Sequence, residues 1–251
     1  MLIVVNADDL GTSEQVNNEI FDLIETGLVT SSTIITNAPA FDHVAKRVRD
    51  FPSCSFGVHL NLTVFAPAGT PSGLEPILDQ NGWLSKRLFA TAISSELRRA
   101  LLRELTVQVE RALEAGIPIT HFDSHNHVHT IPQLFPVLKS LQRKFGVRRV
   151  RSTINVLPMG ERMSVARRLK KEAFSMALRH LYRTRSPEGL GDFRDFHGAL
   201  QAHRQPRFRS LELMVHPGTK NPRYNEEVDL LRSSWREMLS ADVIFGSYHL
   251  L

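Results

Sequence analysis

The sequence predicts an α/β protein built as one parallel β/α barrel. Strand-like apolar runs alternate with helix-like amphipathic segments along the chain, as in folds whose strands pair in parallel beneath covering helices. Acidic or imidazole side chains follow four of the strand-like runs, as expected where the carboxyl ends of barrel strands build a site. With 251 residues, 42% of them hydrophobic, the chain is long enough for a single domain covering residues 1–251.

The residue pattern places the elements in order. The predicted strands cover residues 2–6, 31–36, 55–60, 119–123, 147–152, 211–215 and 242–246. The predicted helices cover residues 13–26, 39–50, 94–115, 132–145 and 226–239. No low-complexity linker or internal repeat divides them.

The first strand, Met1–Val5, is apolar and β-branched and leads to the adjacent carboxylates Asp8 and Asp9. Two ionised side chains at the end of a buried strand are costly unless a cation or a proton relieves them. The simplest arrangement that relieves both charges places one Asp on a metal ion and keeps the other as a general base. The alternative is that one of them caps the next helix, although Thr12–Gln15 already offers a capping box.

Two further strands each deliver one histidine. His59 ends the third strand, and His216 follows the sixth, just before the turn-forming Pro217–Gly218. A lone histidine in an apolar strand is more often a core residue than a ligand. The position of both at strand ends favours a shared site.

The run His121–His129 holds four imidazoles and a carboxylate and carries the clearest chemical signal. Every second residue is an acid or an imidazole, so a segment leaving a strand would place them on one side of the backbone. These are ligands that divalent cations take at neutral pH. Because four imidazoles rarely bind one ion, some are expected to cap helices or to bond to neighbours instead.

The segment 64–93 interrupts the alternation of strands and helices. It is rich in proline and glycine and precedes the helix predicted at 94–115. We interpret it as an insertion over the barrel mouth that acts as a substrate lid, with an uninvolved surface loop as the alternative.

The net charge of +5 is concentrated in the basic amphipathic segment 162–185. One interpretation is a peripheral contact with anionic lipid headgroups or another polyanion. The other, which we favour from the sequence, is a solvated helix that packs one face on the barrel. No motif supports binding to nucleic acid.

Composition also bears on location. The single cysteine, Cys54, excludes an intrachain disulfide, so a reducing compartment is allowed. The apolar N-terminal run lacks the basic region of a signal peptide, and no apolar stretch approaches the roughly 20 residues that cross a bilayer. We expect a cytoplasmic protein without a transmembrane segment.

Five motifs occur in order over most of the chain. They are Asn6–Gly11, Val29–Thr33, Gly57–Thr63, His121–His129 and His216–Gly218. Together they resemble the motifs of the YdjC family of carbohydrate deacetylases, whose members are similar to chitooligosaccharide deacetylase and to a hopanoid-associated deacetylase. The resemblance implies a distorted seven-stranded β/α barrel related to polysaccharide deacetylases. It also implies one divalent metal ion and hydrolysis of an N-acetyl group on an amino sugar, with release of acetate.

The resemblance further implies a role for each matched residue. Asp9, His59 and His125 become the metal ligands, Asp8 the general base, and His216 the general acid. The remaining candidates are expected behind the ligands or in the substrate pocket: Asp123, His127, His129, Asn61 and Arg151.

The chain departs from the family pattern at two places. In Arg148–Thr153 no proline follows the arginines, which leaves open whether Arg149 or Arg151 serves the site; Arg151 is the one we select. Leu10 stands where phenylalanine is common in the family, which is a conservative change.

The metal and the substrate class stay open at this point. A site of two histidines and one aspartate suits Zn, Co, Ni or Mn, and the resemblance adds Mg. The substrate is expected to be a chitooligosaccharide or a lipid-linked N-acetylglucosamine, and the protein a monomer or homodimer. The alternatives are another metal-dependent hydrolase on the same barrel, either a phosphoesterase or an amidohydrolase, and a non-catalytic carbohydrate-binding protein. A mere binder needs neither a base nor an acid beside a metal.

Overall fold

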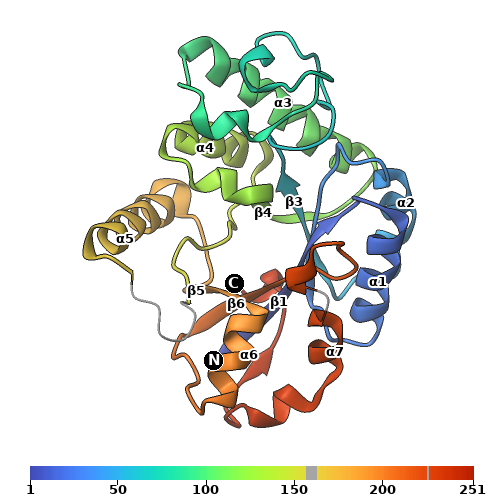
Figure 1. Cartoon of the computed structure of the whole chain (residues 1–251), viewed down its shortest axis with the longest axis vertical. Coiled ribbons are helices and arrows are strands. Elements are labelled where there is room, and N and C mark those ends of the chain that lie inside the picture. The colour runs from blue at the N-terminus through green and yellow to red at the C-terminus, as the bar shows by residue number, and fades with distance from the viewer. Residues whose placement is uncertain (157–162, 225) are drawn as a thin grey trace.

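A computed structural model describes residues 1–156, 163–224 and 226–251. It confirms the predicted α/β class, with seven parallel strands in one sheet surrounded by helices (Figure 1). The strands are β1 (Leu2–Leu10), β2 (Ser31–Ile34), β3 (Ser55–Leu60), β4 (Ile119–Ser124), β5 (Gly189–Asp192), β6 (Ser210–Val215) and β7 (Ile244–Phe245). The sheet order is β4-β3-β2-β1-β6-β5, and β7 pairs with the start of β1.

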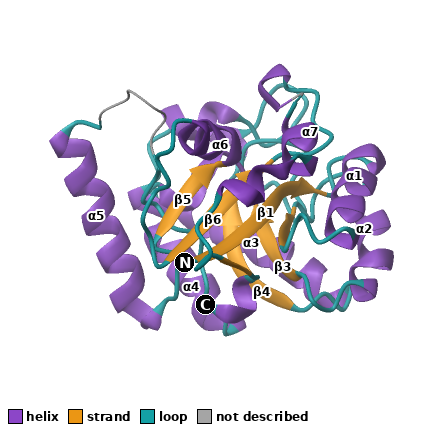
Figure 2. Cartoon of the chain, turned by 90° about the horizontal axis from the view of Figure 1, so that it is seen from below, coloured by secondary structure: helices purple, strands orange, loops and turns teal. Residues whose placement is uncertain are grey.

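Helices cover the outside of this sheet, as Figure 2 shows. They are α1 (Glu14–Glu25), α2 (Phe41–Arg47), α3 (Ser95–Glu114), α4 (Phe135–Phe145), α5 (Val165–His180), α6 (Phe193–Gln201) and α7 (Glu227–Arg232). Serine hydroxyls cap several of them: Ser13 accepts from the N–H of Val16, and Ser94 from the N–H of Leu97. The apolar core lies between the sheet and these helices.

The sheet is a distorted barrel that continuous ladders of hydrogen bonds do not close. Among the described residues between β4 and β5, the chain makes isolated parallel bridges, which pair Phe122 with Val150, Arg149 with Arg185 and Asn155 with Leu190. The prediction of a regular strand at 147–152 is therefore wrong, because this segment leaves β4 after Val150 and reaches β5 by Asn155. Residues 148–156, called the bridging segment below, lie between β4 and β5 without forming a full ladder with either strand.

The sequence analysis missed β5 and the helix α6 that follows it. Gly189 and Gly191 interrupt any apolar run in β5, yet both glycines have a packing reason. A Cβ at Gly189 would lie 2.9 Å from the ring of Phe208, and one at Gly191 would lie 3.3 Å from Leu213. The strand is thus specified by close contacts with distant residues, not by its own hydrophobicity.

The interior of the barrel is polar at the level of the candidate site. Side chains from several strands and from the bridging segment are almost completely buried there: Asn6, Asp8, Ser31, Thr33, His59, Asp123, Arg151 and Glu212. Such groups are tolerated inside a protein only when they are paired with one another. Their pairing determines the geometry of the site.

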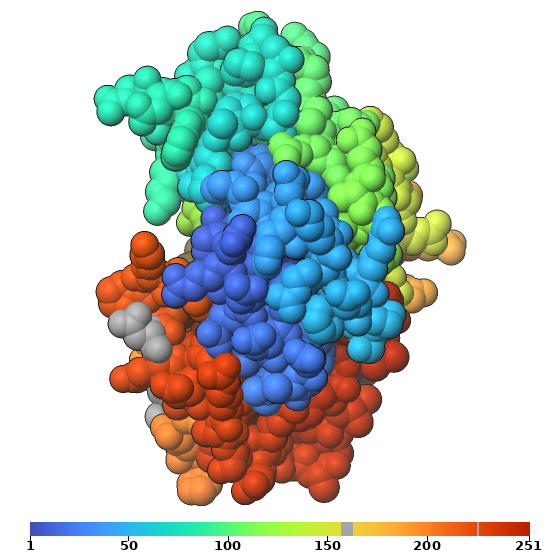
Figure 3. Space-filling model, turned by 90° about the vertical axis from the view of Figure 1, so that its right-hand side faces the viewer, coloured from blue at the N-terminus to red at the C-terminus, as the bar shows by residue number. Residues whose placement is uncertain are grey.

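The segment 64–93 packs against α3. The N–H groups of Ala68 and Gly69 each donate to the Glu104 carboxylate at 2.9 Å, and Leu74 and Ile77 are fully buried. Figure 3 shows the segment at the upper end of the molecule. Its role as a substrate lid stays a prediction.

Within the described residues, no helix has both the length and the hydropathy that crossing a lipid bilayer requires.

Candidate metal and catalytic centre

The carboxyl ends of β1, β3 and β4 and the loop after β6 meet at one cluster. Asp8 and Asp9 lie in the last part of β1, His59 near the end of β3, and Asp123 near the end of β4, while His216 follows β6. Because these strands run parallel, residues distant in sequence converge at this end of the barrel.

A bulge in β1 turns both aspartates toward the site. Adjacent residues of a regular strand point to opposite faces, so Asp8 and Asp9 should diverge. The pairing of β1 with β2 shifts register between Ala7 and Leu10, and Asp9 has a φ of 67° in the left-handed region. This irregularity allows Asp8 to face the barrel interior while Asp9 reaches the histidines.

The loop after β4 places His125 against Asp9. The strand ends at Ser124, and a short 3₁₀ helix over His125–Thr130 follows, with Asn126 and His127 at positive φ. The nitrogen Nδ1 of His125 lies 2.8 Å from Oδ1 of Asp9. The alternation expected from His121 to His129 therefore stops at the end of the strand, and the histidines point in different directions.

His59 is held by a carboxylate behind it. Its Nδ1 lies 2.7 Å from Oδ1 of Asp123, and its Nε2 faces Asp9 Oδ1 at 3.4 Å. The hydroxyl of Thr33 lies 3.1 Å from the same Nδ1 and donates to Asp123. Burial opposes the charged imidazole, but Asp123 and Asp8 outweigh it and raise the pKa of His59 to about 10. The ring is thus fixed with Nε2 directed toward Asp9.

Arg151 links the buried carboxylates. Its guanidinium donates to both oxygens of Asp8, at 2.7 and 2.5 Å, and to Glu212 at 2.8 Å. It also pairs with Asp123 at 2.8 Å. Burial alone would raise the pKa of Asp8, yet Arg151 outweighs that effect and holds it well below its usual range. Of the two arginines considered from the sequence, Arg149 instead donates to the carbonyl of Leu251, so Arg151 is the one at the site.

Three residues form a group that can hold a metal ion. One oxygen of Asp9 and one nitrogen each of His59 and His125 all lie within 4.8 Å of one another. One carboxylate and two imidazoles are a donor set that divalent transition metals accept. The Nδ1 contact with Asp123 gives His59 the carboxylate support that metal-binding imidazoles usually have. The residues therefore fit a cation.

A second group, Asp8, His59 and Asp123, meets the same distance criterion. Here the guanidinium of Arg151 already pairs with both carboxylates. The two groups also share His59. This arrangement favours a single cation, bound on the Asp9 side.

His216 lies beside Asp8 in the same cluster. Its Nε2 is 3.9 Å from Oδ2 of Asp8, and its ring stacks on Tyr224 with centroids 4.2 Å apart. The backbone N–H of His216 donates to the buried carboxylate of Glu227. Burial lowers the pKa of the His216 imidazole, and the negative charge of Asp8 partly offsets this effect. Tyr224 and Glu227 thus fix the ring beside Asp8.

Three of the candidates lie outside this cluster. His129 is buried and bonds through Nδ1 to Ser124, while His121 stacks on Tyr248 with ring centroids 3.6 Å apart. The side chain of Asn61 bonds within the turn after β3, to the carbonyl of Val64 and the N–H of Thr63, and to Asn37. These residues support loops and the interior; the structure does not bring them to the metal-binding group.

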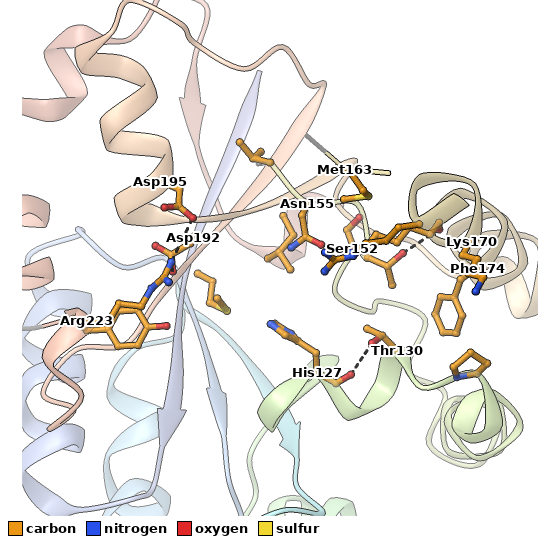
Figure 4. Close-up of a pocket in the computed structure, with 18 residues that line it drawn as sticks. His127, Thr130, Ser152, Asn155, Met163, Lys170, Phe174, Asp192, Asp195 and Arg223 are labelled. Atoms are coloured by element: carbon orange, nitrogen blue, oxygen red, sulfur yellow. Dashed lines mark hydrogen bonds and ion pairs between the residues drawn. The ribbon is translucent and has the colours of Figure 1, made fainter. Parts of the chain in front are cut away.

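His127 instead lines a cavity of about 610 Å³ beside the site. Figure 4 shows this cavity between His127, the helix α5 with Lys170 and Phe174, and the opposite wall with Asp192 and Arg223. Burial lowers the pKa of His127 to about 4, so its imidazole is neutral at physiological pH. Tyr224, which stacks on His216, also lines the cavity and so joins it to the catalytic cluster.

Sequence reasoning missed several residues that shape the centre. Glu212 carried a readable signal, because a carboxylate within the apolar run Leu211–Val215 of a buried strand needs a partner. Tyr224 and Glu227 carried none, since their contacts with His216 arise only in the folded chain.

Comparison with known proteins identifies relatives that match a little over half of the chain. A carbohydrate deacetylase of Geobacillus stearothermophilus is 38% identical over 143 residues, which is 57% of this chain and 56% of that protein. Carbohydrate deacetylase 1 of Listeria innocua is 38% identical over 151 residues, or 59% of each protein. The match thus spans a little over half the length of these curated relatives.

A solved structure from Enterococcus faecalis shares the fold. It is described as a candidate cellobiose-phosphate cleavage protein and superposes with a TM-score of 0.79 at 20% identity, covering 99% of this chain and 98% of that one. The family model described as YdjC-like protein matches residues 2–241. This match, which includes Asp8, Asp9, His59, His125 and His216, shows that the chain belongs to the YdjC-like protein family.

Proposed function

We propose that this protein is a metal-dependent carbohydrate deacetylase that hydrolyses the N-acetyl group of an amino sugar and releases acetate. The observation that carries the proposal is the position of Asp8 and His216 beside the group Asp9, His59 and His125. The curated relatives named carbohydrate deacetylase support the same reaction. The acetylated substrate is expected to be a chitooligosaccharide or a lipid-linked N-acetylglucosamine.

Asp9, His59 and His125 would hold one divalent cation, with Zn or Mg as the first candidates and Co, Ni or Mn next. A cation held there would supply Lewis acidity, polarising the amide carbonyl and lowering the pKa of a water molecule. Asp123 and Thr33 hold the ring of His59 in the orientation that such a site needs.

Asp8 is proposed as the general base. Its two hydrogen bonds from Arg151 keep the carboxylate ionised and fix its plane. An ionised, immobile carboxylate can accept a proton from the attacking water without first losing one. His216 is proposed as the general acid, because its Nε2 lies 3.9 Å from Oδ2 of Asp8 and, when protonated, can donate to the departing amine nitrogen.

The cavity beside the cluster is proposed to bind the sugar. It contains hydroxyl and amide side chains suited to sugar hydroxyl groups, including Ser152, Thr153 and Asn155. The neutral imidazole of His127 faces it from the metal-binding loop. Occupation of this cavity would bring an acetamido group near Asp8 and His216.

The test is acetate release from diacetylchitobiose by metal-stripped protein resupplied with one divalent cation at a time. We expect activity that depends on the cation and that falls by about 10²–10⁴-fold in Asp8→Asn at metal saturation. Asp42→Asn, which changes an exposed carboxylate on α2, is the matched control and should keep full activity. Near-normal turnover of Asp8→Asn would show that another group is the base.

Metal stoichiometry separates this proposal from other hydrolytic chemistry. A phosphoesterase that uses two metal ions needs two adjacent cation sites. Arg151 occupies the only second group found among the described residues, so we expect one ion per chain. Two tightly bound ions per chain, with no acetate released, would favour the phosphoesterase alternative.

A further inference from the structure

The helix α5 exposes an apolar stripe on its outward face. Val165, Leu169 and Met176 are 73%, 59% and 58% exposed, and their spacing places them on one side of the helix. Leu181, directly after the helix, is 48% exposed. Ten large hydrophobic side chains are this exposed among the described residues, and four of them lie between Val165 and Leu181. An exposed apolar patch of this kind is typical of an interaction surface.

The opposite face of α5 is fixed against the barrel. Ser175 and Leu178 are buried, and Phe174 packs edge to face on Phe135 of α4 with ring centroids 5.3 Å apart. Lys171 on this side donates to Asn155 of the bridging segment. The helix therefore cannot rotate its apolar stripe inward without breaking these contacts.

Cations flank the stripe on both sides. Over Val165–His180 the chain carries five lysine and arginine residues against the single acid Glu172. By helical spacing Arg168 and Arg179 lie along one edge of the stripe, and Lys170, which also lines the cavity beside His127, lies beyond the other edge. Glu172 is already paired with Arg168 at 2.8 Å. The outward half of α5 is thus an apolar stripe between two positive edges.

We propose that α5 is an interfacial helix that docks this protein on an anionic lipid surface. Such helices immerse an apolar face at the boundary of headgroups and acyl chains while lysine and arginine contact the anionic headgroups. Figure 2 shows α5 at the edge of the molecule, where its outer face is accessible. This inference does not depend on the proposed reaction.

Charge and side-chain composition argue against two other binding partners for this surface, a second copy of the chain and nucleic acid. A second copy bound through the same stripe would bring the positive edges of two helices together, since a two-fold contact is self-complementary. Nucleic acid would engage the cations but not the aliphatic stripe, which offers no aromatic platform for bases. An anionic lipid surface satisfies both the stripe and its edges.

Docking through α5 would also fix the position of the candidate site relative to the lipid surface. Lys171 and Phe174, on the packed side of α5, line the cavity beside His127. A helix lying on a lipid surface would place that cavity on the protein side of α5, one helix diameter, roughly 10 Å, from the surface.

The first experiment is flotation of the full-length protein with vesicles. Vesicles of equal parts phosphatidylcholine and phosphatidylglycerol are compared with pure phosphatidylcholine. We expect binding to the anionic vesicles alone, and a roughly tenfold or greater fall in partitioning for Val165→Gln/Leu169→Gln/Met176→Gln. The matched control, Leu113→Gln/Met238→Gln, removes comparably exposed apolar side chains elsewhere and should bind as the wild type does.

A second measurement tests the proposal even if the triple variant fails to fold. In Leu169→Trp, the new indole should shift its emission to the blue with anionic vesicles and be quenched by brominated acyl chains. Absence of wild-type binding to anionic vesicles, or an unchanged Leu169→Trp spectrum with them, would overturn the proposal. Sedimentation of the wild type as a dimer that the triple variant abolishes would assign the stripe to a second copy instead.

Discussion

Arg151 is the residue on which the polar interior depends. Its guanidinium is fully buried and pairs with Asp8, Asp123 and Glu212. Burial alone would lower the pKa of Arg151, but the three carboxylates hold it well above its usual range. Breaking a buried ion pair from one side leaves uncompensated charge, which is far costlier than never having built the pair.

We therefore expect Arg151→Met to reduce the free energy of unfolding by about 3–5 kcal/mol, as measured by urea denaturation. Arg149→Met is the control, because Arg149 bonds to the C-terminal carbonyl of Leu251 and touches none of the three carboxylates. Its cost should stay below about 1.5 kcal/mol. Equal stability of the two variants would mean that the three carboxylates do not need Arg151.

A single residue, Glu227, predicts how the stability of the protein depends on pH. Burial raises the pKa of this carboxyl from its ordinary value of 4.5 to about 8. The folded state thus keeps a proton that the unfolded state releases, and the contribution of Glu227 to stability falls as pH rises from about 4.5 to about 8. One proton corresponds to a slope of at most about 1.4 kcal/mol per pH unit.

The measurement is urea denaturation of the wild type and Glu227→Gln at several pH values within that window. The stability of the variant relative to the wild type should increase with pH, because glutamine has no proton to lose. Glu226→Gln changes the exposed neighbour and should leave the slope of the wild type unchanged. A constant difference between Glu227→Gln and the wild type across the window would exclude a protonated Glu227.

At the scale of the element, the strand β3 depends on one position that has no side chain. Gly57 lies opposite His121, and a Cβ at this position would be 2.7 Å from Cε1 of the ring and from the His121 carbonyl oxygen. The ring of His121 can occupy this position, stacked on Tyr248, only because residue 57 has no side chain. His59, two residues further along β3, depends on the same pairing with β4.

Gly57→Ala should therefore destabilise the fold by about 1–3 kcal/mol and displace His59 from Asp123. Thermal unfolding measures the first effect, and the His59 ring resonances in an NMR spectrum report the second. Gly198→Ala in α6 is the matched control, because a Cβ there meets no atom within 4 Å. It should stabilise the helix by up to about 1 kcal/mol. Similar behaviour of the two alanine variants would contradict the steric argument.

At the scale of the whole molecule, a bound cation would link β1, β3 and the loop after β4. Asp9, His59 and His125 come from these three parts of the chain, and they meet only in the folded state. A ligand that binds only the folded state stabilises it by about 2.7 kcal/mol at a hundredfold excess over its Kd.

Resupplying a saturating divalent cation to the stripped protein should raise Tm by about 5–10 °C. His125→Ala should abolish most of this increase, since it removes one ligand. His249→Ala, which changes an exposed histidine near the C-terminus, should keep it. An equal increase in both variants would locate the cation elsewhere.

The fold class followed from the sequence because parallel α/β folds leave a repeated signal. Buried strands read as short apolar runs and covering helices as amphipathic ones, and this alternation located β1, β2, β3, β4, β6 and β7. The sequence did not predict the strand β5 or the bridging segment 148–156, because close packing of glycines and isolated bridges produce no periodic pattern.

The sequence by itself determined the chemical inventory: adjacent aspartates after one strand, single histidines after two others, and a histidine-rich loop. Only the tertiary structure decided which of them meet. The bulge at Asp9 and the left-handed turn at Asn126 set directions that no side-chain period encodes. Arg151 and Arg149 would share a face of a regular strand, yet one lies in the interior and the other at the C-terminus. The physical reason is that side-chain direction at irregular backbone depends on contacts between residues more than a hundred positions apart.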